Sequence, residues 1–173
     1  MKTRAFNFLI DVPVSNHWEN VDLMRTSVMN CFAAVFRNMD GVHSFATIAA
    51  ELLENAIKYG HWNETDGDPH LHLRVWGDQS EARVQVENPV DLTSADLDEL
   101  LRTIAWLKSF NSGEEAYRTR LLEVAASPKG VSRLGLARII YEGDCTLDAE
   151  LDGTMLRVTS VTRLNGTSSQ PTA

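Results

Sequence analysis

The sequence predicts an α+β fold, a two-layer sandwich with helices on one face of a mixed sheet. Three observations predict it: an opening strand followed by two helices, a central hairpin followed by further helices, and a closing hairpin. The chain has 173 residues, and a chain of about 150 residues already buries roughly 70% of its unfolded surface in one core. We therefore expect one domain over residues 1–164, with a disordered polar tail over residues 165–173.

The start of the chain predicts a strand and a helix. Alternating apolar residues over 4–12 are typical of a strand, which Pro13 is expected to end because proline has no N–H for strand pairing. Asn16 and Glu19 form a capping-box-like pair. Apolar residues then recur at helical spacing, so we expect a helix to about residue 38.

A second helix is expected over residues 44–59. Asp40 and Gly41 predict a break before it, and Gly60 is its expected C-terminal stop. The remaining chain predicts two hairpins and three helices, with hairpins over 71–88 and 146–161, a helical pair over 91–126 interrupted at 111–113, and a helix over 134–141.

Composition excludes several classes of function. The formal net charge is -8, from 16 Lys and Arg against 24 Asp and Glu, and no Lys/Arg stripe is visible for neutralising phosphates, so we expect no nucleic-acid partner. No apolar run approaches membrane-spanning length, and the N-terminus does not resemble a secretory signal. Cys31 and Cys145 have no metal-binding spacing and are expected to be buried thiols. We expect a cytoplasmic protein with no membrane partner.

Three polar residues of the second helix share one edge. A rotation of about 100° per residue brings Glu51, Asn55 and Lys58 together beside the apolar stripe. A carboxylate accepts protons, an amide oxygen coordinates Mg²⁺, and an ammonium holds phosphate oxygens. By spacing alone, the same pattern also fits a solvated polar face.

The segment E-x-x-x-N-A-x-K-Y-G, from Glu51 to Gly60, resembles the N-box of the GHKL superfamily of ATPases and kinases. Upstream, Glu19-Asn20-Val21 followed by Arg25 resembles the first helix of the bacterial anti-sigma-factor serine/threonine kinases. This resemblance implies a histidine-kinase-like ATPase (Bergerat) fold that uses ATP and Mg²⁺. Glu51 would then be the general base, Asn55 the magnesium ligand and Lys58 a phosphate contact.

The segment G-V-S-R-L-G, from Gly130 to Gly135, is similar to the glycine-rich box of the same superfamily. Small residues before a helix let backbone N–H groups approach phosphates, so the resemblance implies that Gly130, Ser132 and Gly135 bind nucleotide. Thr154, in a Gly-Thr pair, resembles the threonine that helps to hold adenine in the superfamily. Without the resemblance, these segments also fit an ordinary loop and an ordinary hairpin turn.

One departure from the superfamily concerns adenine. Where relatives have an Asp-x-Gly loop, whose carboxylate accepts a hydrogen bond from the adenine amino group, this chain has Asn88-Pro89. The Asn88 amide oxygen is the expected substitute acceptor, although Asn88 also fits a plain turn residue before proline. A similar Asn-containing variant is associated with the small kinases that regulate bacterial aggregation and biofilm formation.

Two functions follow from the sequence. The first is an ATP- and Mg²⁺-dependent serine/threonine kinase of the anti-sigma, partner-switching type, which phosphorylates a small antagonist or sigma-factor-like protein. The second is a catalytically weak or inactive binding module of the same fold that regulates a partner by docking, and the Asn88-Pro89 departure favours it. The resemblance also implies a homodimer.

Overall fold

The computed structural model of the protein describes residues 7–36, 39–62, 70–78, 80–126 and 134–164. Its elements are, in chain order, β1 (Phe8–Ser15), α1 (Glu19–Val35), α2 (Met39–Tyr59), β2 (His70–Gly77), β3 (Glu81–Pro89), α3 (Ala95–Leu107), α4 (Gly113–Ala126), α5 (Leu134–Glu142), β4 (Cys145–Asp152) and β5 (Met155–Arg163). Both predicted hairpins, the helical pair and the helix before the last hairpin are confirmed, whereas the predicted tail at 165–173 lies outside the described residues.

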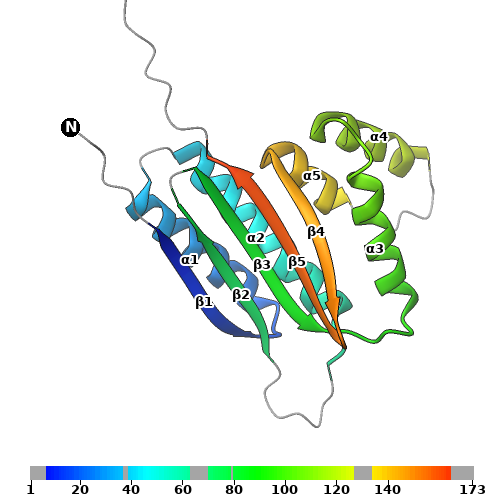
Figure 1. Cartoon of the computed structure of the whole chain (residues 1–173), viewed down its shortest axis with the longest axis horizontal. Coiled ribbons are helices and arrows are strands. Elements are labelled where there is room, and N and C mark those ends of the chain that lie inside the picture. Colours follow the sequence, from blue (N-terminus) through cyan, green and yellow to red (C-terminus); the bar gives the residue numbers. More distant parts are fainter. Residues whose placement is uncertain (1–6, 37–38, 63–69, 79, 127–133, 165–173) are drawn as a thin grey trace, which may run out of the picture.

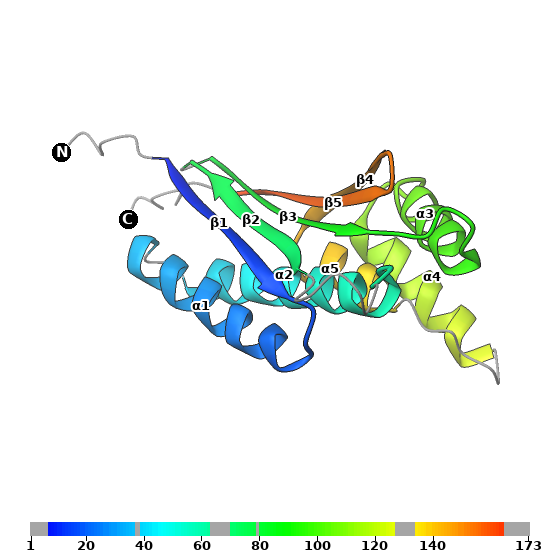
Figure 2. The same ribbon diagram turned by 90° about the horizontal axis from the view of Figure 1, so that it is seen from below.

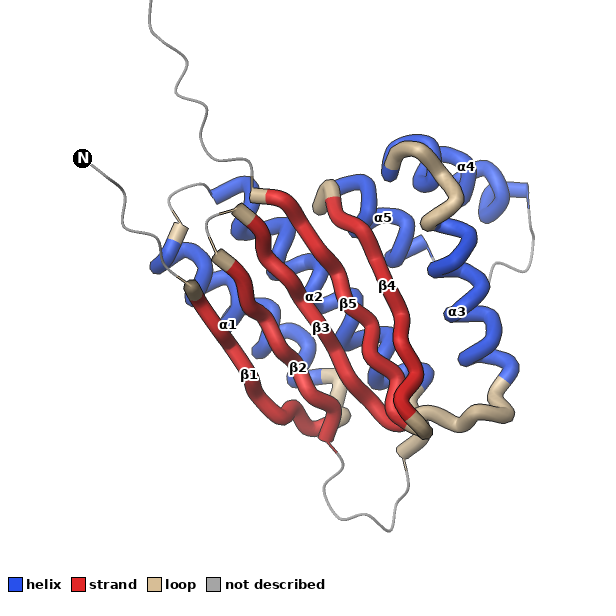
Figure 3. Tube along the Cα trace, viewed as in Figure 1, coloured by secondary structure: helices blue, strands red, loops and turns tan. Residues whose placement is uncertain are grey.

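The strands form one five-stranded sheet in the order β1-β2-β3-β5-β4 (Figure 3). The predicted α+β class is confirmed, but all four strand pairings of the described residues are antiparallel, so the sheet is not mixed as expected. The two hairpins account for two of these pairings. They join through β3 and β5, where Asn88 lies opposite Leu156.

Helices cover one face of the sheet, as predicted (Figures 1 and 2). In the edge-on view of Figure 2, α1, α2 and α5 lie on the same side of the sheet, and no helix of the described residues lies over the other face. Helix α3 differs, because it stands beside the edge strand β4 (Figure 1). Helix α2 lies in the middle of this helical layer, between α1 and α5, and packs against the sheet.

Helix α2 supplies much of the hydrophobic core. Ile48, Ala49 and Leu53 are fully buried under the inward-facing residues of the sheet, such as Leu73 and Val84. Phe45 of α2 stacks on Phe32 of α1, with ring centroids 4.7 Å apart, which joins the two helices at one end of the core. Burial of this apolar face is the main force that holds α2 in place.

Two predictions about the first strand and helix are wrong. Pro13 does not end β1 but lies within it, opposite His72, because an edge strand leaves one side of its backbone unpaired and so tolerates a missing N–H. Asn16 does not cap α1, whose first residue is Glu19 and whose N-cap is Trp18 without a side-chain bond. Instead the Asn20 amide donates to the Ser15 carbonyl oxygen, at 3.0 Å.

The predicted break at Asp40-Gly41 is also wrong, because α2 begins at Met39 and passes through both residues. Glycine inside a helix costs about 1 kcal/mol relative to alanine. Burial of Val42 and Phe45, which are 1% and 2% exposed, offsets that cost. Tertiary packing therefore extends the helix by more than a turn beyond its local signal.

The two thiols differ in environment, whereas both were expected to be buried. Cys31 is exposed on α1 and Cys145 is buried at the start of β4. Burial raises the pKa of the Cys145 thiol to about 11, so almost none of it is the reactive thiolate at pH 8.

We therefore predict that a maleimide at pH 8 labels Cys31 rapidly and Cys145 at least about 100-fold more slowly, because both burial and the thiol form protect Cys145. Mass spectrometry of the labelled chain measures the two rates. Unfolding in urea should make the rates similar, and equal rates in the native protein would contradict the assigned environments.

Candidate functional site

The candidate site lies on the second half of α2. Gly60 ends the helix, and the His61 N–H then donates to the Pro89 carbonyl oxygen at 2.8 Å, which ties the end of α2 to the end of β3. Glu51, Asn55 and Tyr59 follow one another at one-turn intervals on this helix. The fold therefore brings a carboxylate, an amide and a phenol into line beneath the end of the central strands.

Glu51 is held between two residues of α5. Its side chain is 14% exposed and forms an ion pair with the Arg138 guanidinium. On the other side it touches Gly135, where an added Cβ would lie 2.0 Å from Oε2 of Glu51. Only a residue without a side chain allows this approach, so Gly135 is needed for the position of Glu51.

Two opposing effects act on the ionisation of Glu51. Burial raises the pKa of the Glu51 carboxyl above its ordinary value, and the Arg138 guanidinium opposes that rise without cancelling it. The carboxylates of Glu54 and Glu142 also favour the protonated form. A carboxylate with a raised pKa is a stronger base, which suits a proton acceptor.

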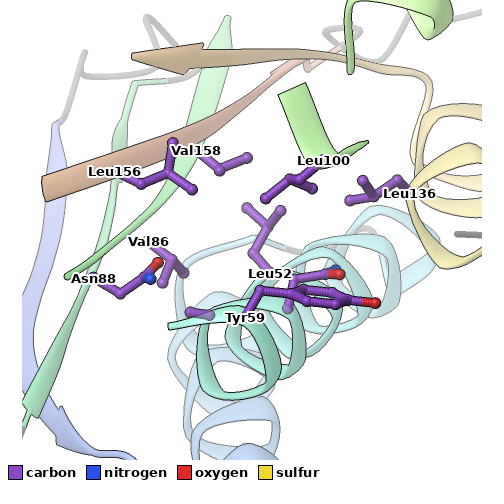
Figure 4. Close-up of a pocket in the computed structure, with 10 residues that line it drawn as sticks. Leu52, Tyr59, Val86, Asn88, Leu100, Leu136, Leu156 and Val158 are labelled. Carbon is purple, nitrogen blue, oxygen red and sulfur yellow. The ribbon is translucent and has the colours of Figure 1, made fainter. Parts of the chain in front are cut away.

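Asn55, one helical turn after Glu51, lines a cavity together with Asn88. The cavity is enclosed by α2, α3, α5, β3 and β5, and it is lined by Leu52, Asn55, Ala56, Tyr59, Val86, Asn88, Leu100, Leu136, Leu156 and Val158 (Figure 4). Asn88 is 2% exposed and points from β3 into this space, with its amide N–H donating to the Pro89 carbonyl oxygen at 3.0 Å. The Asn55 amide N–H donates to the Glu51 carbonyl oxygen at 2.6 Å.

The cavity is narrow, with a volume of about 10 Å³. That is room for about one water molecule, whereas small-molecule sites usually measure about 300–1,000 Å³. Leu100 of α3 and Leu136 of α5 are among the side chains that line it (Figure 4). A ligand of the size of adenine would fit this volume only after lining side chains move.

The other expected site residues lie further away. Lys58 is exposed, with its Nζ 4.9 Å from the ring centroid of Tyr59, and it does not line the cavity. Thr154 is exposed in the turn between β4 and β5, where its carbonyl oxygen accepts a 2.8 Å hydrogen bond from the Val90 N–H. Gly130 and Ser132 lie outside the described residues.

Sequence reasoning did not single out Arg138 or Leu136. Both follow Gly135 on the first turns of α5. Arg138 lies three residues after the glycine that touches Glu51, and this helical spacing is the signal that could have indicated a contact between Arg138 and Glu51. No signal in the sequence indicated that Leu100, 36 residues earlier than Leu136, would meet it across the cavity.

Comparison with known proteins supports the fold. No protein-family model and no curated protein sequence matches the chain. A chain in the crystal structure of the SiaB-SiaC complex from Pseudomonas aeruginosa is similar in structure, with a TM-score of 0.62 over 90% of this chain and 89% of that chain, at 13% sequence identity. At this identity the likeness shows a shared α+β architecture, in agreement with the ATPase-like fold that the sequence predicts.

The helices give one further result about the chain. None of those in the described residues combines the length and the apolar character that a bilayer-spanning segment needs.

We predict that Gly135→Ala lowers the free energy of unfolding by about 1–3 kcal/mol, because the new methyl group overpacks the contact and displaces the Glu51 carboxylate from Arg138. Urea denaturation measures the change. Gly41→Ala in α2 is the matched control: nothing lies within 4 Å of the new Cβ, so alanine should stabilise the helix by up to about 1 kcal/mol. Equal stabilisation by both substitutions would show that Glu51 is not held against Gly135.

Proposed function

We propose that the protein is an ATP- and Mg²⁺-dependent regulatory serine/threonine kinase of the anti-sigma, partner-switching type, acting on a small antagonist protein. The observation that carries the proposal is the largely buried Glu51 carboxylate one helical turn before Asn55, which lines a cavity together with Asn88. The likeness in fold to a chain from a two-protein complex supports a protein partner.

The residues at the cavity fit a magnesium ion that arrives with phosphate groups. The described residues include no group of three His, Cys, Asp or Glu side chains that would hold a metal by themselves. Magnesium often uses one or two protein oxygens and completes its shell with substrate phosphates and waters. Since the Asn55 amide N–H is bonded to the Glu51 carbonyl oxygen, its amide oxygen is the atom suited to such an ion.

Each residue then has a distinct role. Bound ATP with Mg²⁺ supplies the phosphoryl group and neutralises its charge. Glu51 accepts the proton of the acceptor hydroxyl, whose oxygen bonds to the γ-phosphorus while ADP leaves. Asn88 provides the acceptor for adenine, and Lys58, Gly130, Ser132, Gly135 and Thr154 are the proposed nucleotide contacts around it.

A second function is favoured by the closed form of the site. The cavity has a volume of only about 10 Å³, and Glu51 is engaged by Arg138. A protein with these features could retain the fold, lose turnover and regulate its partner by docking. Calorimetric titration with ATP distinguishes the two functions: a kinase gives a saturable heat that depends on Mg²⁺, and a docking module gives none.

We predict that Asn55→Ala abolishes the effect of Mg²⁺ on ATP affinity while leaving the protein folded, because the lost amide oxygen is the proposed metal contact and the side chain is only partly buried. Calorimetry with and without Mg²⁺ measures this effect, and circular dichroism checks the fold. Unchanged Mg²⁺-ATP affinity in the variant would rule out Asn55 as the metal ligand.

We predict that Glu51→Gln preserves Mg²⁺-ATP affinity within a few-fold but slows transfer of the γ-phosphoryl group by about 100-fold or more, because glutamine keeps the shape and removes the base. Transfer is followed with γ-labelled ATP, to the acceptor protein or to water.

Glu54→Gln is the control for this experiment, since Glu54 is exposed on the same helix and the charge change is identical. It should stay within a few-fold of the wild-type rate, because Glu54 acts on Glu51 only through its contribution to the raised pKa. If wild type and Glu51→Gln transfer phosphate equally fast, Glu51 is not the base. If wild type binds a partner but neither binds ATP nor transfers phosphate, the docking function replaces the kinase.

A further inference from the structure

A second, roomier cavity lies between the first half of α2 and the end of α5. Its volume is about 130 Å³, and its lining residues include Ser44, Thr47, Ile48, Ile139 and Glu142. None of its described lining residues also lines the cavity at Asn55 and Asn88. Because a single water needs roughly 10–15 Å³, this cavity has room for several water-sized groups. Neither function proposed for the candidate site accounts for this second cavity.

The lining combines an apolar floor with a polar rim. Ile48 and Ile139 are 0% and 1% exposed and form the floor. Thr47 and Ser44 carry hydroxyl groups at the rim, and the Ser44 hydroxyl donates to the Glu142 carbonyl oxygen at 3.4 Å, so the two helices are joined there. This pattern suits a ligand with an apolar stem and a polar head.

The charge at the rim is negative. The Glu142 side chain is 53% exposed, and its described ion pair is a 4.0 Å contact with Nε of Arg138, whose guanidinium is already engaged by Glu51. Glu142 is also the last residue of α5, where the helix dipole adds partial negative charge. Among the described lining residues, the other titratable group is His43. The Glu142 carboxylate is therefore incompletely neutralised and favours a cationic ligand.

We propose that this cavity binds a lysine or arginine side chain of a partner protein. The aliphatic stem lies along Ile48 and Ile139, and the cationic head reaches the Glu142 carboxylate and the Thr47 hydroxyl. The formal net charge of -8 favours a basic partner, because unlike charges steer association and raise the rate of encounter. A bare metal ion fits less well, since the described residues include no cluster of three metal-binding side chains.

The experiment is an amide NMR titration of the full-length protein with n-butylammonium chloride, which reproduces the stem and head of lysine. We expect saturable shifts at Thr47, Ile48 and Gly143, with a dissociation constant in the millimolar range. n-Butanol, which has the stem without the charge, should bind at least about fivefold more weakly because a charge-assisted hydrogen bond is lost.

Two variants test the anchor. Glu142→Gln should weaken n-butylammonium binding about fivefold or more, because it removes the charge but keeps the shape. Glu150→Gln, an exposed position on β4 with the same change of charge, should leave the affinity unchanged. The absence of saturable shifts at the cavity in wild type, or equal affinities in wild type and Glu142→Gln, would overturn the proposal.

A peptide arm separates a protein partner from a free amine. The peptide Gly-Gly-Lys-Gly-Gly should shift the same amide signals as n-butylammonium, and Gly-Gly-Gln-Gly-Gly should shift none of them. If the free amine binds and the lysine peptide does not, the cavity is a small-amine site and the proposed partner contact is wrong. This outcome is independent of the kinase proposal, because no measurement in it involves ATP.

Discussion

The burial of α2 is the constraint on which the rest of the structure depends. This helix packs its apolar face under the sheet and brings one polar edge against α5, so Glu51 must lie where two elements meet. A carboxylate in that position has lost much of its water. It is accommodated because Arg138 pairs with it and because Gly135 leaves room for it. A single helix placement thus fixes the position, the partner and the ionisation of the candidate base.

The same packing bears on both proposed functions. Burial raises the pKa of Glu51 and so makes it a better base, whereas the ion pair with Arg138 favours its ionised form and occupies one carboxylate oxygen. Leu100 and Leu136 line the same narrow cavity as Asn55 and Asn88. The proposed kinase would need this cavity to widen when nucleotide binds, whereas the proposed docking module would not.

Arg138 also connects the candidate site with the second cavity. Its guanidinium pairs with Glu51, and its Nε lies 4.0 Å from the Glu142 carboxylate at the rim of that cavity. Two carboxylates, one on α2 and one on α5, therefore share the Arg138 guanidinium. The cavity proposed for a basic side chain therefore lies next to the ion pair of the candidate site.

The sequence by itself determined the α+β class, both hairpins, the end of α2 at Gly60 and the alignment of Glu51 with Asn55, because periodicity, turn residues and helical spacing are local properties. Only the tertiary structure decided the rest. Neighbours distant in the chain determine the direction of the strands and the continuation of α2 through Gly41. They also determine the position of Pro13 in an edge strand and the exposure of Cys31. The pairing of Glu51 with Arg138, 87 residues later, and the meeting of Leu100 with Leu136 depend on how helices dock. Burial in a shared core sets that docking, and it is a property of the whole chain that no local pattern contains.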